Sequence, residues 1–313
     1  MLCSFHNACM KTATPTMNAA ATGSSTAAEQ RGTLLMTLGG VLLGSIGIFI
    51  TEAGQDPVTT VLFRCLFGGL ALLMWGAACG RLSELRLSGR ALLAAVLAGV
   101  LMVSNWALFF AAIPLTSIGV STVVFHLQPF WVLLLGAWLL REHLSSTRAL
   151  ACGVALLGLA LATGLFDQPA AQVLSSGYLT GLLLCLIGSL CYAGVPLIAK
   201  LAPGVSAFAL AWWQCAVGVL LSCWWPLWHG LPPAGAAWGW LIGLGSLHTG
   251  LAYVLLYAGM SRLPTSRIAV LQFIYPATAI IIDWLVYGHA LGPLQFGGLL
   301  LLGGALWTVR RCA

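Results

Sequence analysis

Charged residues are scarce in this chain of 313 residues. Lys and Arg number 13, Asp and Glu number 7, and together they make up 6% of the sequence. An ordinary soluble domain carries about 25% charged residues. So few charges cannot solvate the surface of a globule of this size, which excludes a soluble enzyme. Because 60% of the residues are hydrophobic, a disordered chain is excluded as well. The composition predicts an all-α polytopic membrane protein.

Motifs for metal, nucleotide or covalent chemistry are also lacking. The ten cysteines form no C-x-x-C pair and no Cys/His zinc spacing. No Walker-type loop, H-E-x-x-H pair or G-x-S-G motif occurs. His248 follows Ser246 by only two residues, a spacing that turns the two side chains apart on a helix. The basic residues are scattered singly and form no nucleic-acid-binding patch. We expect no catalytic residue, no cofactor, no metal and no nucleic-acid partner.

Long apolar segments are abundant instead. A helix that crosses a bilayer needs about 20 mostly apolar residues. Ten segments meet this length, and they are 33–53, 57–78, 90–111, 115–139, 147–165, 177–199, 205–228, 236–259, 264–287 and 291–309. The segment 1–31 lacks the apolar run of a signal peptide, so it is interpreted as a disordered cytoplasmic tail. Within it, Met10 and Met17 are alternative start sites to Met1.

The distribution of charge predicts the orientation in the membrane. If the N-terminus is cytoplasmic, 12 of the 13 basic residues fall in cytoplasmic segments, and Arg64 inside the second apolar segment is the exception. Glu52, Asp56 and Asp167 then lie on the opposite side. Since cytoplasmic loops of membrane proteins are enriched in Lys and Arg, both termini are predicted on the cytoplasmic side of an inner (plasma) membrane.

An internal repeat relates the two halves of the chain. A shift of 147 residues without gaps places Trp106 on Tyr253 and Pro129 on Pro276. Five helices per half is an odd number, so the second half must lie upside down relative to the first. The predicted five-helix repeats are 32–165 and 177–310. Inverted repeats of this kind recur in secondary transporters, with the substrate site at the repeat interface.

Short motifs recur in both halves around the two prolines. They are Gln128–Trp131, Leu140–Ser145 and Gly158 in the first half, and Gln272–Pro276, Tyr287–Leu291 and Gly298 in the second. With these motifs the chain resembles the drug/metabolite transporter superfamily in its EamA-type, ten-helix branch. Arg64 also matches an arginine of such proteins. The resemblance implies a carrier of small metabolites, frequently an exporter of amino acids or related compounds. His289 departs from the pattern, because the second repeat usually has Glu there.

Burying a polar side chain in a membrane-spanning helix costs free energy, so each such residue is a candidate for a functional or structural role. His126 lies one turn before Pro129, which frees a backbone carbonyl and opens the helix wall. Together with Gln128 it is a candidate to bind substrate, and His126 is also suited to relay a proton. The alternative for His126 is a neutral ring that donates to the neighbouring backbone. Asn105 and Trp106, with Tyr253 in the second half, are predicted to line the same site.

A polar stripe follows one face of the ninth apolar segment. Gln272, Tyr275, Ala279 and Asp283 recur at helical spacing, which predicts that they line a cavity. Asp283 is the candidate for proton coupling. The alternative is that it meets water near the end of the segment or pairs with Arg64.

Two further charged residues admit more than one role. Arg64 either contacts an anionic group of the substrate or has a structural role, in which it pairs with Glu52 or Asp56 or extends to the interface. We favour the structural role, because Arg64 lies near the helix end. Glu142 is expected to anchor its loop by pairing with Arg148 or by capping the following helix.

These observations predict a secondary active transporter that works by alternating access around a central site. The alternatives are a channel-like facilitator and a non-transporting intramembrane enzyme. The expected partners are a small-molecule substrate, the lipid bilayer and, as an open option, a coupled proton. Either a monomer or a homodimer is compatible with the sequence.

Overall fold

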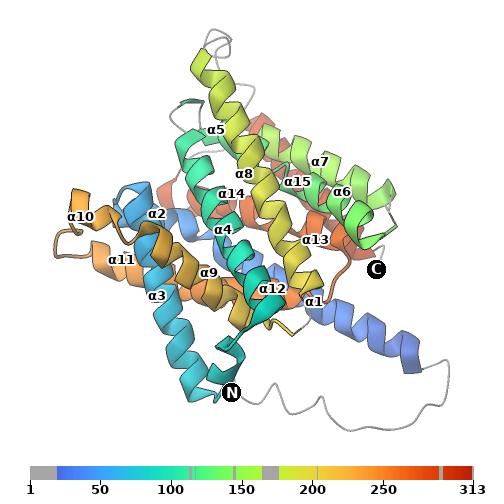
Figure 1. Ribbon diagram of the computed structural model, residues 1–313. Coiled ribbons are helices and arrows are strands. Elements are labelled where there is room, and N and C mark those ends of the chain that lie inside the picture. The colour runs from blue at the N-terminus through green and yellow to red at the C-terminus, as the bar shows by residue number, and fades with distance from the viewer. Residues whose placement is uncertain are drawn as a thin grey trace.

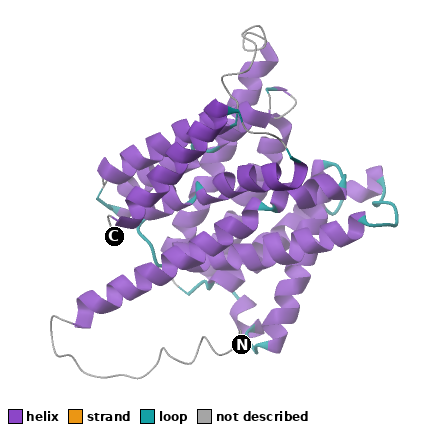
Figure 2. Cartoon of the chain, turned by 180° about the vertical axis from the view of Figure 1, so that it is seen from behind, coloured by secondary structure: helices purple, strands orange, loops and turns teal. Residues whose placement is uncertain are grey.

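The computed structural model describes most of the chain as helix. The described residues are 20–112, 115–116, 118–143, 146–163, 176–202, 204–288 and 292–311. Within them every regular element is helical and no strand occurs, as Figure 2 shows.

The helices belong to one or the other half of the chain, and Figure 1 labels them. The first half contains α1 (Ala20–Gly44), α2 (Ile46–Ala53), α3 (Pro57–Ala78), the short 3-10 helix η2 (Leu82–Leu85), α4 (Gly89–Ala112), α5 (Ile118–Phe125), α6 (Gln128–Leu140) and α7 (Ser146–Ala162). The second half contains α8 (Ser176–Leu201), α9 (Ala207–Ser222), α10 (Trp225–His229), α11 (Ala237–Gly243), the π-helical segment η6 (Leu244–Leu251), α12 (Ala252–Met260), α13 (Thr265–Leu271), α14 (Ile274–Tyr287) and α15 (Pro293–Arg311). In Figure 1, α3 and α9 lie on one flank of the bundle and α7 and α15 on the other.

The ten predicted spans are all found as apolar helices. Eight helices of the described residues have the length and hydropathy to cross a membrane, and two shorter apolar helices, Ser146–Ala162 and Pro293–Trp307, supply the fifth and the tenth. The first helix begins at Ala20, so residues 20–31 continue α1 instead of belonging to the predicted tail. Residues 1–19, Asp167 and His289 lie outside the described residues.

Apolar side chains cover the outside of the bundle. Trp138 on α6 is 75% exposed, Leu150 on α7 is 70% exposed and Leu220 on α9 is 70% exposed. A soluble monomer rarely shows continuous apolar surface of this extent, whereas lipid chains solvate it. The chain is therefore a multi-pass membrane protein.

Helices at equivalent positions of the two halves pack against each other in opposite directions. On α3 and α9, a Cβ at Gly76 would contact Phe208, whereas a Cβ at Gly218 would contact Cys65. The α7–α15 pair runs antiparallel in the same way. If a helix runs antiparallel to its counterpart in the other repeat, one half can be superposed on the other only after it is turned upside down. The packing thus confirms the predicted inverted repeat.

The fourth and ninth spans are each broken, at nearly equivalent positions of the two repeats. The fourth span changes from α5 to α6 at His126 and Leu127, and the ninth changes from α13 to α14 at Gln272 and Phe273. Pro129 and Pro276 fall in the first turns of α6 and α14. A proline there lacks only an N–H that the helix start does not use. Broken spans of this kind are tolerated in a membrane where they are buried in protein or line a cavity.

Small residues let α1 approach the ninth span closely. A Cβ at Gly40 would lie 3.0 Å from a side-chain carbon of Ile274, and a Cβ at Gly44 would lie 2.5 Å from one of Thr278. The two glycines, four residues apart, form one packing face of α1. This contact holds α1 beside the break in the ninth span.

Candidate substrate site

A central cavity of about 160 Å³ lies beside both helix breaks. Eight of the nine residues that the sequence singled out line it, and they come from both halves of the chain. They are Arg64, Asn105, Trp106, His126, Gln128, Tyr253, Gln272 and Tyr275. The only one absent from its lining is Asp283. The inverted repeat thus brings residues far apart in the sequence to one place.

Two aromatic side chains that the repeat relates meet in this cavity. The rings of Trp106 on α4 and Tyr253 on α12 lie 6.1 Å apart between centroids, with an angle of 67° between their planes. The guanidinium carbon of Arg64 lies 4.0 Å from the centre of the Trp106 ring. The edge-to-face arrangement and the cation–π contact both hold Trp106 in a fixed orientation.

The polar residues of α4 and α6 are fixed by the neighbouring helix α8. The side-chain amide of Asn105 donates to the carbonyl oxygen of Gly188 at 2.9 Å. The indole N–H of Trp131 donates to the hydroxyl of Ser189 at 2.9 Å. Gln128, the first residue of α6, is 6% exposed. These contacts tie two spans of the first half to the first span of the second half.

His126 lies at the break in the fourth span. Its Nδ1 is 2.7 Å from the carbonyl oxygen of Thr122, and its ring stacks near that of Tyr275 with 6.0 Å between centroids. A carbonyl oxygen only accepts hydrogen bonds, so Nδ1 must carry the proton. In a neutral ring this leaves Nε2 as an acceptor. The contact to the backbone matches the second role that the sequence allowed.

A second cavity of about 480 Å³ extends from the central cavity toward one end of the bundle. The two cavities share Thr122, His126 and Tyr275 in their linings. Asp283 and Tyr287 line the far part of the second cavity. The stripe predicted on the ninth span therefore faces cavities along its whole length, with Gln272 in the first cavity, Tyr275 in both, and Ala279 and Asp283 in the second.

Arg64 is buried, and its contacts differ from the structural role that the sequence favoured. Its side chain is 2% exposed, which excludes extension to the interface. Its Nε donates to the hydroxyl of Thr249 at 3.0 Å. Asp56 instead accepts the backbone N–H groups of the first turn of α3, and Glu52 accepts from the hydroxyl of Tyr287 at 3.2 Å.

Several residues near the cavity escaped the sequence analysis. Tyr192 on α8 lines it, and Ser45, at the break between α1 and α2, lies 2.8 Å from Nε2 of the buried His248. The 147-residue shift relates Ser45 to Tyr192, so the repeat carried a signal for both. Ser246 donates to the carbonyl oxygen of Ile242, away from the ring of His248.

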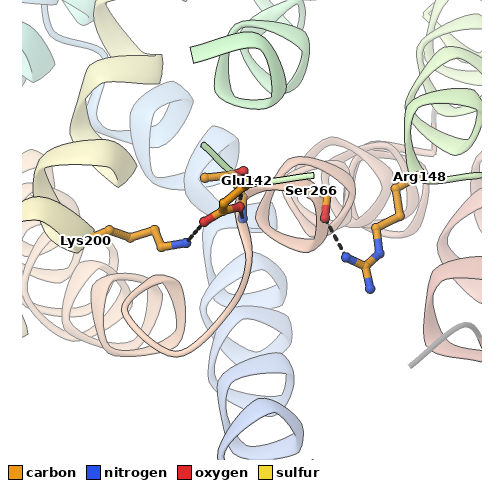
Figure 3. A network of polar contacts seen from close by, with 5 residues as sticks. Glu142, Arg148, Lys200 and Ser266 are labelled. Carbon is orange, nitrogen blue, oxygen red and sulfur yellow. Dashed lines mark hydrogen bonds and ion pairs between the residues drawn. The ribbon is translucent and has the colours of Figure 1, made fainter. Parts of the chain in front are cut away.

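The other end of the bundle is closed by polar contacts between the two halves (Figure 3). Glu142, just after α6, accepts from the ammonium of Lys200 through Oε1. Its Oε2 accepts from the backbone N–H of Thr265 at 2.8 Å and from the hydroxyl of that residue at 2.6 Å. Arg148 donates to the hydroxyl of Ser266 at 2.5 Å. We call this region the Glu142 end, and the end with Asp283 the Asp283 end.

A further contact, between Arg267 and Glu29, joins the halves at the Glu142 end. Nη1 of Arg267 on α13 lies 2.9 Å from a carboxylate oxygen of Glu29 on α1. The side chain of Arg267 is 4% exposed, whereas that of Glu29 is 40% exposed. Three of these contacts, from Glu142, Arg148 and Glu29, converge on the first turn of α13 at Thr265, Ser266 and Arg267. The start of the ninth span is therefore the point where this end is held shut.

The ionisation of Glu142 reflects these contacts. Partial burial raises the pKa of its carboxyl, but the hydrogen bonds from Lys200 and Thr265 outweigh this effect and bring the pKa below its usual value. The carboxylate is therefore charged near neutral pH and accepts on both oxygens.

Comparisons with known proteins agree with this architecture. The EamA-like transporter family model matches residues 30–164 and 179–311. A protein named uncharacterized transporter YxxF from Bacillus subtilis (strain 168) is 29% identical over 281 residues, which cover 88% of this chain and 89% of that protein. An uncharacterized transporter from Archaeoglobus fulgidus is 27% identical over 282 residues, covering 90% and 97%. One solved crystal structure has the same fold, with a TM-score of 0.76 at 19% identity over 90% of this chain and 98% of that one.

The family model covers both halves of the chain, each over five spans. It begins its second match after the long connection that separates α7 from α8. The inverted repeat, the paired motifs around Pro129 and Pro276 and this match agree: the chain belongs to the EamA-like transporter family.

Proposed function

We propose that the protein is a secondary active transporter that moves a small metabolite, an amino acid or a related compound, across the membrane by alternating access. The family and the named relatives support transport as the general activity. The observation that carries the proposal is the central cavity, in which polar and aromatic side chains from both halves converge beside two broken helices. Pockets for small molecules commonly combine aromatic walls with a few polar groups.

The conformation described here corresponds to one side of an alternating-access cycle. At the Glu142 end, Glu142, Arg148 and Glu29 of the first half hold the start of α13, whereas the central cavity continues into the larger cavity at the Asp283 end. By the charge rule the Glu142 end is cytoplasmic, with both termini on that side of the inner membrane. Transport then requires α13 to separate from Glu142, Arg148 and Glu29, so that the central cavity opens toward the cytoplasm.

Proton coupling through Asp283 is part of the proposal. Asp283 and His126 line the same cavity, which leads from the Asp283 end to the central site. A carboxylate near the outer mouth and a histidine at the helix break provide two groups that can take up and release a proton. His126 also lines the central cavity, so it connects the cavity that contains Asp283 with the proposed substrate site.

The proposal is tested by transport in proteoliposomes loaded with unlabelled amino acids and metabolites, with labelled solute added outside. We expect saturable counterflow of at least one solute. Replacing Trp106 or Tyr253 by Leu should reduce the rate about tenfold or more, because each removes an aromatic wall of the cavity. Trp138→Leu is the matched control, since that tryptophan is 75% exposed on the lipid-facing surface.

The outcomes separate the alternatives. Saturable counterflow that fails in Trp106→Leu and survives in Trp138→Leu supports a carrier with its site at the central cavity. Flux that rises linearly with concentration and shows no counterflow contradicts a carrier and favours a channel-like facilitator. Absence of flux for every solute, in protein that stays folded, contradicts transport of this class of compound.

A further inference from the structure

Among the described residues that line the central cavity, Arg64 is the one that carries a formal positive charge. This arginine lies in the first half of α3, is 2% exposed and lines the cavity. Its Nε hydrogen-bonds to Thr249 and its guanidinium carbon lies over the ring of Trp106. These contacts direct the rest of the guanidinium toward the cavity lining.

Among the described residues, no acid forms an ion pair with Arg64. Nη2 is buried and has no hydrogen-bond partner among the described residues. None of the ion pairs found in the described part of the chain includes Arg64. Burial of an unpaired charge is strongly unfavourable, so such groups are normally paired. A membrane interior makes the requirement stricter.

A second side chain of the cavity is also left without partners. Both polar atoms of the Gln272 amide, Nε2 and Oε1, are buried and make no hydrogen bond among the described residues. Gln272 stands at the break in the ninth span, on the opposite half of the chain from Arg64. One cavity therefore contains an unpaired cationic donor and an unpaired amide, which offers a further donor and an acceptor.

The remaining lining defines what else the ligand must satisfy. Aromatic rings form much of the wall, among them Trp106, Tyr253 and Tyr275. No Asp or Glu is among the lining residues that the structure describes. The cavity of about 160 Å³ is small, and one arginine balances one negative charge. These features fit a small monocarboxylate with an apolar or aromatic body better than a phosphate, which carries more charge.

We propose that Arg64 binds the carboxylate of the transported solute through Nη2, while Gln272 hydrogen-bonds to a second polar group and the aromatic rings hold its apolar body. This assignment rests on the proposed function and narrows the substrate to compounds that carry a carboxylate. An ammonium group is not required for binding, because no acid of the cavity is available to pair with it. Arg64 acts as a binding residue and not as a structural ion-pair partner.

The test is a binding measurement that needs neither a membrane nor a gradient. Thermal unfolding of the purified protein in detergent is followed with matched pairs of a carboxylate and its primary amide, from acetate and acetamide to 3-phenylpropanoate and 3-phenylpropanamide. Ligands that bind only the folded state raise its melting temperature. We expect at least one carboxylate to stabilise the protein more than its amide does. Equal effects within every pair overturn the proposal.

Substitution of Arg64 assigns the effect to this residue. Arg64→Gln should weaken the carboxylate about 10-fold to 100-fold and leave the amide nearly unchanged, since a hydrogen bond between charged groups is lost. Arg81→Gln is the control, because Arg81, between α3 and η2, pairs with Glu84 and is not among the residues that line the cavity. If Arg64→Gln does not unfold cooperatively, Arg64→Lys serves instead. It keeps the charge but loses the fork geometry, so carboxylate binding should weaken and amide binding should not.

The result is distinguishable from a failure of the proposed function. If a carboxylate stabilises the protein more than its amide does but no solute shows counterflow, the result supports a carboxylate site at Arg64 and contradicts transport. Counterflow of a cationic or uncharged solute, together with no preference for the carboxylate in any pair, supports transport. The same result contradicts the proposed role of Arg64. Unchanged preference in Arg64→Gln also overturns it.

Discussion

Glu142 and Thr265 join the two halves of the molecule at one carboxylate oxygen. Oε2 of Glu142 accepts from the backbone N–H of Thr265 at 2.8 Å and from its hydroxyl at 2.6 Å. A backbone N–H at the start of a helix has no partner within that helix. Glu142 therefore caps α13 from the other half of the chain. Since Oε1 of the same carboxylate accepts from Lys200, one side chain ties α6, α8 and α13 together.

Replacing Glu142 by Gln should loosen the start of α13. An amide has one oxygen where the carboxylate has two, so Gln can serve Lys200 or Thr265 but not both. We expect about tenfold faster hydrogen–deuterium exchange in Thr265–Leu271, which corresponds to about 1.4 kcal/mol of opening free energy. Glu84→Gln is the matched control, because the carboxylate of Glu84 pairs with Arg81, three residues earlier in the same half of the chain. Equal exchange in the two variants would show that Glu142 does not hold this end.

The same contact predicts a pH dependence at the acidic side. The pKa of the Glu142 carboxyl is lowered in the closed arrangement, so the contact is fully present above the usual value for Glu, about 4.3. As the pH falls through the lower pKa of the closed form, the carboxylate is protonated and the stabilisation is lost. Exchange in α13, corrected for its intrinsic rate, should therefore be constant near neutral pH and rise only below about pH 4.3. Glu142→Gln should remove this dependence, and a rise that persists in the variant would assign it to another group.

Close packing of α7 on α15 predicts that Gly→Ala substitutions on these two helices differ sharply in their effect on stability. A Cβ at Gly158 would lie 2.7 Å from the carbonyl oxygen of Gly298, and a Cβ at Gly298 would lie 2.5 Å from the backbone nitrogen of Ala162. Gly158→Ala and Gly298→Ala should each lower the free energy of unfolding by about 1–3 kcal/mol, because backbone atoms cannot yield to the added methyl group.

Two glycines on the same helices serve as controls for this pair. A Cβ at Gly153 or at Gly297 would meet nothing within 4 Å. Gly153→Ala and Gly297→Ala should be neutral or stabilise by up to about 1 kcal/mol, since Ala favours helix. Thermal unfolding in detergent measures all four variants. Equal destabilisation by members of both pairs would contradict the packing described for α7 and α15.

The sequence predicted most of the fold because membrane helices have a strong signal. Length, apolar composition and the one-sided distribution of Lys and Arg each constrain the count of spans. The start of α1 at Ala20 was missed, because residues before the apolar run have the polar composition of a tail. Glu29 in this segment pairs with Arg267 on α13, a contact that local composition does not encode.

The central cavity was predicted better than the contacts of its charged residues. The internal repeat identified Trp106, Tyr253 and the two prolines as candidates. His126 and Gln272 were identified because they are polar residues within apolar runs. The partner of Arg64 was not predictable, since Thr249 lies in η6, far away in the sequence, and an apolar pattern does not reveal which faces meet. For the same reason the link between Glu142 and Lys200, separated by 58 residues, was found only in the structure.

Asp283 is predicted to set the dependence of transport on a pH gradient. It lines the cavity that His126 joins to the central site. Asp283→Asn keeps the size and polarity of the side chain but cannot take up a proton. We expect its uptake to lose the acceleration by a pH gradient, about tenfold or more, while counterflow without a gradient continues. Counterflow exchanges solute for solute and needs no net proton movement.

Asp56→Asn is the matched control for Asp283→Asn. Asp56 lies at the same end of the bundle and caps α3, where its carboxylate accepts from the backbone N–H groups of Val58 and Thr59 at 3.0 Å. Asn caps helices about as well as Asp, so this variant should fold and respond to the gradient like the wild type. Gradient-driven uptake that survives in Asp283→Asn would make Asp283 structural. Loss of counterflow in the same variant, with Asp56→Asn unaffected, would instead assign Asp283 to solute binding.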